Sequence, residues 1–595
     1  MANPYITFLS LLVFLPVLGA LAIAFFPKDK PGATKLFALA ICALTFLLNL
    51  LMIAADGSSW QFVTGVRQMQ TVFNVPWIPS FHIDYFMGLD GISFPLVLLT
   101  TFSCVLAMGA SWNIAKHVKA YCILFLLLET GMIGVFLSLD FFLFYVFWEV
   151  VLLPMYFLIG VWGGPRREYA ALKFFLYTLL GSVFMLIAIL MLYYSSDVRA
   201  LSDQALAEVH VVPTTTDGQR AGTEGLKPVA DSKQLAAIRD SKEAVHSFNI
   251  LALQRLGQTT DQFNGTALFG KSLQWWAFLL LFVGFAIKVP SVPLHTWLPD
   301  AHVEAPTPIS MLLAGVLLKM GGYGILRICY PICPAAGYDL AWFVCGIGVL
   351  SMVYGAFAAL AQKDFKRLVA YSSVSHMGYV VLGLGAWSVM AGTQYNTDFW
   401  SMGISAAMFQ MIAHGISSAG MFFMVGIIYD RVHHRNLDEF GGLFAKMPVY
   451  CGIAIVMFFA GLGLPGLCGF WGEAFVTLAA WKFSTVLAII SASVVILTAG
   501  YILWTIQRVY LGAEYKGPHG DHITPITHRE LAIAVPLVVF AIFFGVYPKA
   551  VFNYVTPSVE LQVSELKEWA VKNRPAEVKA VAAEGAAADA EVAKR

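Results

Sequence analysis

Seven ionisable side chains interrupt the long apolar runs of this sequence. A charged group at the centre of a membrane helix costs about 2.5–3.5 kcal/mol on insertion scales, so a functional role is the first interpretation of each. Carboxyl, ammonium and imidazole groups all take up and release protons. The chemistry that this set predicts is therefore proton transfer. The seven residues are Glu129, Glu149, Lys288, Lys319, His376, His414 and Glu473.

These seven residues, which we call the midplane row, are predicted to lie at one depth. Glu149 and Lys319 each stand about ten residues from either end of their apolar segment, or about 15 Å deep at 1.5 Å per residue. The others lie well inside segments of their own. Groups that share one level cannot conduct protons straight across a membrane. They are suited to conduct them along its midplane.

Two members of the row stand beside predicted helix breaks. Lys288 precedes Pro290 and Pro293, and Glu473 follows Gly-Leu-Gly-Leu-Pro-Gly at 461–466. Proline removes backbone hydrogen bonds, and membranes tolerate such a gap where it lines a cavity. A pair of interrupted segments in corresponding positions of two halves indicates a transport site.

Some members of the row also have a structural interpretation. Glu129 could be one partner of a buried ion pair, and His376 and His414 could bond a neighbouring carbonyl group.

The pKa of a lysine falls in a dry site and rises beside a carboxylate. We therefore expect Glu149 to modulate the proton affinity of Lys288.

The composition supports a membrane protein. Of the 595 residues, 59% are hydrophobic and 12% are charged, whereas soluble domains carry about 25% charge. The net charge of +1 gives no reason to expect a nucleic acid partner. The eight cysteines form no CxxC pair, and there is no GxxxxGK[ST] motif, so no iron–sulfur, zinc or nucleotide site is expected in this chain.

The elements that must position the row are apolar helices. About 20 apolar residues cross the hydrocarbon, and fourteen segments qualify. The predicted fold is an all-α polytopic membrane protein with two inverted five-helix repeats, helices 4–8 and 9–13, each containing a broken helix. The segments lie near residues 5–26, 33–55, 89–111, 120–139, 140–161, 172–195, 273–297, 308–328, 340–361, 369–390, 402–429, 449–478, 486–511 and 530–554.

Lysine and arginine in the short loops predict the orientation. Alternate loops are rich in them and are predicted to be cytoplasmic, whereas the other loops hold only Arg67, Arg327 and Lys482. Both termini are then extracytoplasmic. A short amphipathic surface helix is expected within Asp231–Leu256. The predicted divisions are helices 1–6 in 1–195, a polar extracytoplasmic insertion in 196–271, helices 7–14 in 272–555, and an Ala/Glu/Lys-rich extracytoplasmic tail with little to bury in 556–595.

Four long motifs resemble one known family. They are FYVFWEVVLLPMYFLIGVWGG (144–164), FAIKVPSVPLHTWLPDAHVEAPTPIS (285–310), KDFKRLVAYSSVSHMGYV (363–380) and QMIAHGISSAGMFF (410–423). They are similar to the antiporter-like subunits of respiratory complex I, over residues 1–195 and 248–555. The stretch 196–247 departs from the family, in which this loop is short.

The resemblance implies roles for six members of the row. It implies an ion pair between Glu149 and Lys288, on the fifth and seventh helices, and makes Lys319 the central relay. Glu473 becomes the terminal group on the exit side. His376 and His414 match polar residues of the connecting axis.

The resemblance also implies a setting. A glutamate at 473, where the two other antiporter-like subunits typically carry lysine, favours the middle one of the three. The implied function is proton pumping coupled to NADH:quinone electron transfer in a bacterial inner membrane. The two other antiporter-like subunits would be neighbours on either side, and flavin, iron–sulfur clusters and quinone would belong to partner subunits.

Two other functions remain open at this stage. Subunits of multi-subunit Na⁺(K⁺)/H⁺ antiporters and of membrane-bound hydrogenases belong to the same family, although the antiporters are expected to carry lysine at the position of Glu473. A membrane scaffold that conducts nothing is the second alternative. Seven buried ionisable residues are a costly feature for a scaffold.

Overall fold

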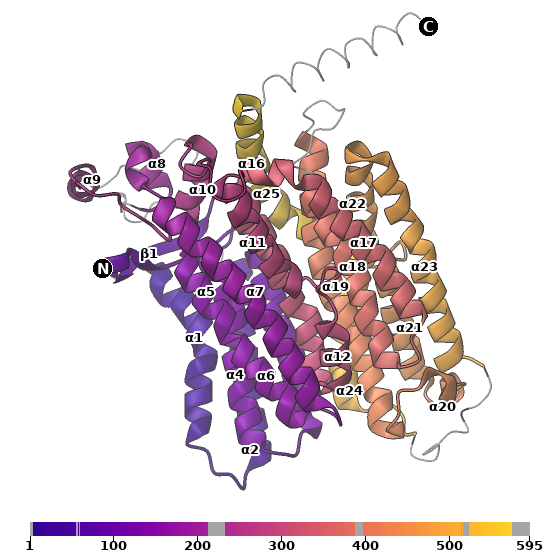
Figure 1. The fold of residues 1–595 in the computed structure, drawn as a ribbon. Coiled ribbons are helices and arrows are strands. Elements are labelled where there is room, and N and C mark those ends of the chain that lie inside the picture. Colours follow the sequence, from indigo (N-terminus) through magenta and orange to yellow (C-terminus); the bar gives the residue numbers. More distant parts are fainter. Residues whose placement is uncertain are drawn as a thin grey trace, which may run out of the picture.

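The computed structural model describes residues 4–54, 58, 60–211, 232–386, 397–512, 515 and 523–573. Long helices stand side by side in an elongated bundle, with the N-terminal segments on one side, the helices within 443–509 on the other, and the two last helices between them (Figure 1). Twelve helices in the described residues are long and apolar enough to cross a membrane. The prediction of an α-helical polytopic membrane protein is confirmed.

The long helices follow the predicted apolar segments closely. Each unbroken span consists of one helix or of short helices that continue one another. They are α1 (Pro4–Ala24), α2 (Pro31–Ala54), α3 (Phe94–Ala110), α4 (Val118–Leu137), α5 (Phe141–Val150) with α6 (Leu152–Trp162), α7 (Arg167–Ser195), α13 to α15 within Thr307–Ile332, α17 (Ala341–Leu360), α18 (Phe365–Gly385), α19 (Thr397–Val432), α23 (Thr485–Val509) and α24 (His528–Val546).

Two further apolar helices are short because the chain breaks where the sequence predicts. Helix α11 (Leu273–Lys288) ends at Lys288 and is followed by α12 (Trp297–Glu304). Helix α21 (Pro448–Leu462) is followed by α22 (Gly469–Phe483), and between them Gly463 has φ +79°, a left-handed conformation that glycine adopts without strain. With these two broken helices the spans would number fourteen. That count and the inverted repeat stay predictions.

The span that carries Lys319 is irregular in a different way. Two π-helical turns, η4 (Leu313–Leu317) and η5 (Ile325–Cys329), lie on either side of α14 (Leu318–Gly324), with α13 (Thr307–Leu312) and α15 (Tyr330–Ile332) at the ends. Single π-helical turns are rare and occur often at functional sites. Every residue from Pro308 to Ile332 is buried, so this span is the central element of the bundle.

The ends of the long helices form two opposite faces of the bundle. The face that carries the polar insertion is called the insertion face. It holds α8 (Asp203–Glu208), α9 (Ser232–Arg239) and α10 (Ile250–Thr259) (Figure 1). The single amphipathic helix expected within Asp231–Leu256 is therefore two short helices. Residue 231, at its start, lies outside the described residues. An antiparallel hairpin of β1 (Gln70–Ile78) and β2 (Ile83–Leu89) lies beside them, and the sequence analysis did not predict it.

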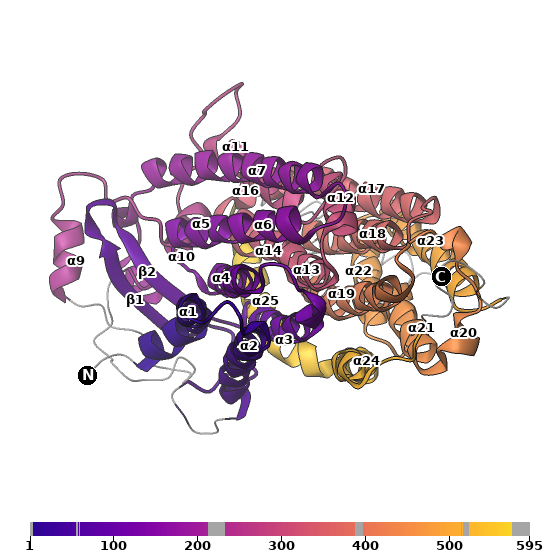
Figure 2. The same ribbon diagram turned by 90° about the horizontal axis from the view of Figure 1, so that it is seen from below.

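The C-terminal segment corrects one expectation. Helix α25 (Lys549–Asn573) runs across the bundle from α24 past α3 to α10 (Figure 2). Val551, Val555, Val559 and Val563 recur every four residues and form a buried stripe. The tail was expected to have little to bury, and the predicted boundary at 555/556 falls inside this helix. Residues 574–595, the rest of the predicted tail, lie outside the described residues.

Candidate functional site

Lys319 and His414 form the centre of the site. Lys319 lies on α14 and is fully buried, and its Nζ is 2.7 Å from Nδ1 of His414 on α19. The same Nζ donates a hydrogen bond of 2.5 Å to the carbonyl oxygen of Ala314, in the π-helical turn η4. The lysine therefore has a fixed position and a direct contact with a second proton carrier.

His376 and Glu473 continue the site toward the broken helix. Nδ1 of His376, on α18, is 2.7 Å from Oε1 of Glu473 at the start of α22. The amide of Gln410 donates to the same carboxylate oxygen at 3.0 Å, and the Tyr501 hydroxyl lies 3.3 Å from the other ring nitrogen of His376. Both members of the pair are more than 90% buried.

The two contacts are separated by one short gap. The ring centroids of His376 and His414 are 6.0 Å apart. Nε2 of His414 is buried and has no hydrogen-bond partner among the described residues. The two rings form no direct hydrogen bond with each other, and a bridging water is nearly as good a link as a direct hydrogen bond. We call Lys319, His414, His376 and Glu473 the connected segment.

The expected ion pair between Glu149 and Lys288 is not formed. Nζ of Lys288 lies 5.1 Å from the ring centroid of Trp148 and 5.7 Å from that of Phe174, and it has no hydrogen-bond partner among the described residues. The two charges are near enough to attract each other but do not touch. The physical reason is that aromatic faces hold the ammonium group through cation–π attraction at the end of α11.

Glu149 faces a different environment from the rest of the site. It is half-buried near the C-terminal end of α5, and its neighbour Val150 is exposed. Its Oε1 is buried without a hydrogen-bond partner among the described residues. The side chain therefore lies at the lateral rim of the bundle, within electrostatic reach of both Lys288 and the surface.

Glu129 lies in a separate cluster. It is fully buried on α4, and its Oε2 accepts a hydrogen bond of 3.1 Å from the thiol of Cys42 on α2. Its Oε1 has no partner within the described residues. None of its hydrogen bonds joins it to the other six members of the midplane row. The structure brings four of the seven candidates together as the connected segment, leaves Lys288 and Glu149 as an electrostatically coupled pair, and sets Glu129 apart.

Sequence reasoning missed a buried ion pair near the insertion face. Nη2 of Arg327 lies 2.6 Å from both carboxylate oxygens of Asp90, and both residues are about 95% buried. Arg327 was assigned to a loop because it stands at the edge of an apolar run, and this assignment is wrong. The available signal was the sequence Ile-Cys-Tyr-Pro-Ile that follows Arg327. It continues the apolar run for about one more helical turn and so places the arginine inside the helix.

A second missed cluster lies at the end of the bundle opposite the insertion face. Glu304 and Lys366 are buried there, and they line a cavity of about 290 Å³ together with Arg435 and Asp430. His302, on α12, is stacked on Phe422 with ring centroids 4.2 Å apart. Its imidazole interacts electrostatically with both Lys366 and Lys319, so it stands between this cavity and the centre of the site.

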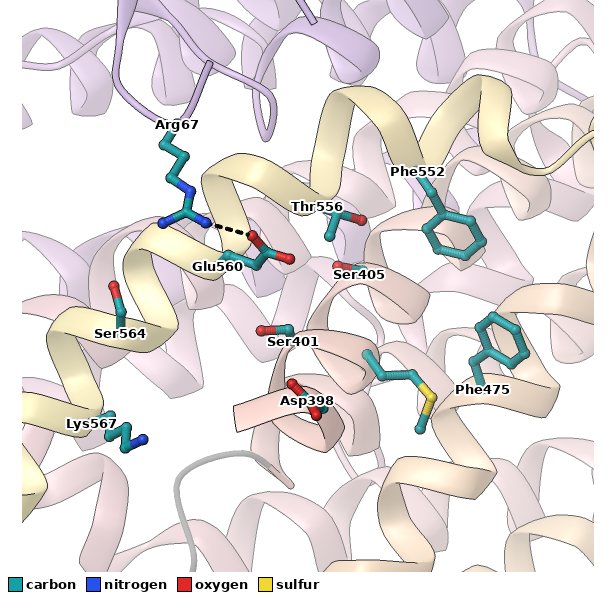
Figure 3. Close-up of a pocket in the computed structure, with 11 residues that line it drawn as sticks. Arg67, Asp398, Ser401, Ser405, Phe475, Phe552, Thr556, Glu560, Ser564 and Lys567 are labelled. Atoms are coloured by element: carbon teal, nitrogen blue, oxygen red, sulfur yellow. Dashed lines mark hydrogen bonds and ion pairs between the residues drawn. The ribbon is translucent and has the colours of Figure 1, made fainter. Parts of the chain in front are cut away.

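A larger cavity of about 640 Å³ lies on the insertion side of α19 (Figure 3). Asp398, Ser401 and Ser405 line it from α19, and α25 faces them across the cavity. Arg67 and Glu560 form an ion pair of 3.2 Å at its edge. The Ser405 hydroxyl is buried and has no hydrogen-bond partner in the described part of the chain.

Metal binding finds no support in the residues that the structure describes. No group of three or more His, Cys, Asp or Glu side chains there could hold a metal ion. All eight cysteines are buried and unpaired. The expectation that redox centres belong to partner subunits stays a prediction.

Two family models match the chain. Residues 138–217 and 245–498 match the model described as NADH:quinone oxidoreductase/Mrp antiporter, TM. Residues 34–139 match NADH-ubiquinone oxidoreductase chain 4, amino terminus. Together the two models cover most of the bundle, including every member of the midplane row.

Solved structures share the fold. A chain of respiratory complex I from Thermus thermophilus with bound NADH matches with a TM-score of 0.73 and 26% identity, covering 94% of this chain and 99% of that one. A chain of the Mrp complex from Dietzia sp. matches with a TM-score of 0.67 and 19% identity, covering 96% and 99%. The second likeness concerns the fold alone.

Curated relatives match over nearly the whole length. NADH-quinone oxidoreductase subunit M of Rhodobacter capsulatus is 40% identical over 555 residues, covering 93% of this chain and 95% of that protein. The protein of the same name from Rickettsia conorii is 35% identical over 559 residues, covering 93% and 98%. The chain therefore belongs to the family of NADH-quinone oxidoreductase subunit M, an antiporter-like membrane subunit of respiratory complex I.

Proposed function

We propose that this chain moves protons in the membrane arm of complex I along Lys288, Lys319, His414, His376 and Glu473. The single observation that carries the proposal is the connected segment. Three helices and one broken helix place four proton carriers in two direct contacts of 2.7 Å, with a 6.0 Å ring separation between them. Apolar membrane helices have no other reason to gather these groups, because each is costly in hydrocarbon.

The geometry supports a definite order of proton transfers. Lys319 donates a proton to Nδ1 of His414, and the ring releases a proton from Nε2, which has no protein partner in the described residues. A water in the gap carries it to Nε2 of His376, where it takes the place of the 3.3 Å contact with the Tyr501 hydroxyl. That ring then releases the proton on its Nδ1 to Oε1 of Glu473. Each histidine takes up a proton at one nitrogen and gives one up at the other, so charge and protons balance.

Glu149 and Lys288 act as the switch that feeds this path. Their charges attract each other without contact, so the proton affinity of Lys288 depends on the charge state of Glu149. Glu149 lies at the lateral rim, where a charge on a neighbouring subunit would act on it. The two other antiporter-like subunits on either side of this chain are the neighbours we propose.

The entry route follows from the cluster opposite the insertion face. Protons enter through the cavity beside Glu304 and Lys366 and reach Lys319 by way of His302. We place this face in the cytoplasm and the insertion face outside the inner membrane, with both termini outside. Electron transfer, with flavin, iron–sulfur clusters and quinone, takes place in partner subunits.

The decisive test replaces Lys319 in the assembled complex. In inverted membrane vesicles that oxidise NADH, Lys319→Ala should lower proton uptake per NADH by about 100-fold, because it removes the one carrier that contacts His414. The matched control is Lys271→Ala, which removes an exposed lysine stacked on Trp275 and should change nothing. Normal pumping by an assembled Lys319→Ala complex would support a scaffold instead.

A further inference from the structure

A line of residues leads from Lys319 toward the insertion face. Tyr323 stands one helical turn beyond Lys319 on α14, and its hydroxyl donates to the carbonyl oxygen of Phe136 at 3.2 Å. The guanidinium carbon of Arg327 lies 5.6 Å from the Tyr323 ring centroid. Arg327 is thus the next charged group along this helix, about 12 Å beyond Lys319. A proton that left Lys319 straight outward would pass Tyr323 and then meet Arg327.

The ion pair at this position is unsuited to pass a proton. An arginine side chain stays protonated in proteins, so it cannot accept a proton and hand it on. Oδ1 of Asp90 also accepts hydrogen bonds from the backbone N–H groups of Ile92 and Ser93, at 3.0 Å each, and from the Ser93 hydroxyl at 3.2 Å. These bonds hold the carboxylate against Arg327, so the pair stands in the direct way out.

Three glutamine side chains fasten the end of this helix. Gln254 and Gln258 of α10 donate amide hydrogens to the carbonyl oxygens of Arg327 and Pro331, at 2.6 and 3.0 Å. Gln562 of α25 donates to the carbonyl oxygen of Leu326 at 2.8 Å. Carbonyl groups near a helix end and a π-helical turn lack regular partners. The glutamines supply those partners, so the carbonyl groups of Leu326, Arg327 and Pro331 need no water to satisfy them.

Two glycines let the outer segments approach the backbone directly. A Cβ atom on Gly257 of α10 would overlap the carbonyl oxygen of Ile332, and one on Gly91 would overlap that of Tyr554 on α25. The N–H of Gly91 also donates to the hydroxyl of Ser558 at 3.0 Å. These contacts pack α10 and α25 directly against the backbone near the Asp90–Arg327 pair.

The side of α25 that faces α19 borders an open cavity instead of close backbone contacts. There, Thr556, Glu560 and Ser564 face α19 across the 640 Å³ cavity, whose volume can hold many waters (Figure 3). Ser405 contributes a buried hydroxyl without a protein partner in the described residues. Helix α25 therefore closes the bundle on the insertion side of Lys319 and leaves a cavity on the insertion side of α19.

We propose that Asp90 and Arg327, with the glutamines of α10 and α25, form a proton seal over Lys319. The seal keeps protons from returning to Lys319 from the insertion face, so they leave the row only after transfer to His414. This inference rests on the proposed function of Lys319. It gives a purpose to α10, which lies within the polar insertion predicted at 196–271.

The test measures passive proton leak rather than pumping. The purified complex is placed in liposomes, a potassium diffusion potential is imposed with valinomycin, and an internal pH dye reports proton entry without NADH. Arg327→Lys keeps the charge but introduces a group that can release its proton. We expect proton conductance to rise by about tenfold or more, which corresponds to a barrier lowered by about 1.4 kcal/mol. The control Arg67→Lys alters the exposed pair with Glu560 on the same helix α25 and should not leak.

A second variant identifies the path of the leak. Adding Lys319→Ala to Arg327→Lys should return the conductance to the wild-type level. A leak that persists in the double variant, or an assembled Arg327→Lys complex as tight as wild type, would overturn the seal. If Arg327→Lys does not assemble, Gln562→Met takes its place in the test. This variant removes the hydrogen bond from Gln562 to the Leu326 carbonyl oxygen, and the same outcomes support or overturn the seal. Failure of the proposed relay itself would appear separately, as normal pumping by Lys319→Ala alone.

Discussion

The two halves of the midplane row are partnered in opposite ways. In the connected segment, Lys319 and Glu473 each contact a histidine at 2.7 Å. In the first half, Lys288 and Glu149 have no such contact, and the lysine rests on aromatic faces instead. A hydrogen-bonded chain passes protons without large movements. The proton affinity of a lysine that is held apart from its counter-charge changes strongly when that charge changes.

This difference indicates how the work is divided. Coulomb attraction between two unit charges falls as the inverse of their separation and of the effective dielectric constant, so a small movement of Glu149 or Lys288 changes their interaction by an amount that matters for proton binding. The connected segment offers no comparable freedom, because Gln410 and Tyr501 hold its terminal pair in place. Glu149 and Lys288 therefore act as the switch, and the connected segment conducts the protons.

The largest effect should come from breaking the connected segment at His414. His414→Gln keeps an oxygen that can accept a hydrogen bond from Lys319 but cannot carry a proton, so proton uptake per NADH should fall by about 100-fold. The measurement is dye quenching in inverted vesicles, with NADH oxidation followed in the same sample. If the histidine served only to hold Lys319 in place, the glutamine variant would pump almost normally.

A smaller effect is expected at Glu149. Glu149→Ala should assemble normally, because the side chain is only half-buried and its Oε1 has no hydrogen-bond partner in the described residues, yet it should lose most proton pumping. Glu149→Asp retains the charge and should keep a large part of the activity. Normal pumping by Glu149→Ala in the intact complex would remove the switch from the account.

The smallest effect is expected at Glu129. Its hydrogen-bond partner is the Cys42 thiol, and none of its hydrogen bonds reaches the rest of the row. Glu129→Gln preserves an acceptor for the thiol, so pumping should stay within about twofold of wild type. A loss as large as that of His414→Gln would restore Glu129 to the path and would require a link that the hydrogen bonds do not show.

Membrane class and segment positions were predictable because hydropathy alone determines them. The breaks after Lys288 and before Glu473 were also predictable, from proline and glycine. The contact between Lys319 and His414 was not, because 95 residues separate them and apolar helices show little difference between their faces. Both residues were correctly singled out, but only the fold could bring them together.

The missed residues stand where sequence rules are ambiguous. Arg327 lies at the end of an apolar run, where a charge normally marks a loop, and its partner Asp90 is 237 residues away. The buried stripe of α25 consists of four valines in an otherwise polar stretch, too few to register as apolar. The failed expectation for Glu149 and Lys288 came from the resemblance, which implied a pair but could not give its distance.

The most direct test of the connected segment is proton pumping by Glu473→Gln. Glutamine has nearly the shape of glutamate and can still bond His376 and Gln410, but it cannot take up a proton. The account predicts that proton uptake per NADH falls sharply in the assembled complex, while Glu473→Asp retains part of it. Near-normal pumping by Glu473→Gln would show that no proton binds at this position, and would contradict the proposed path.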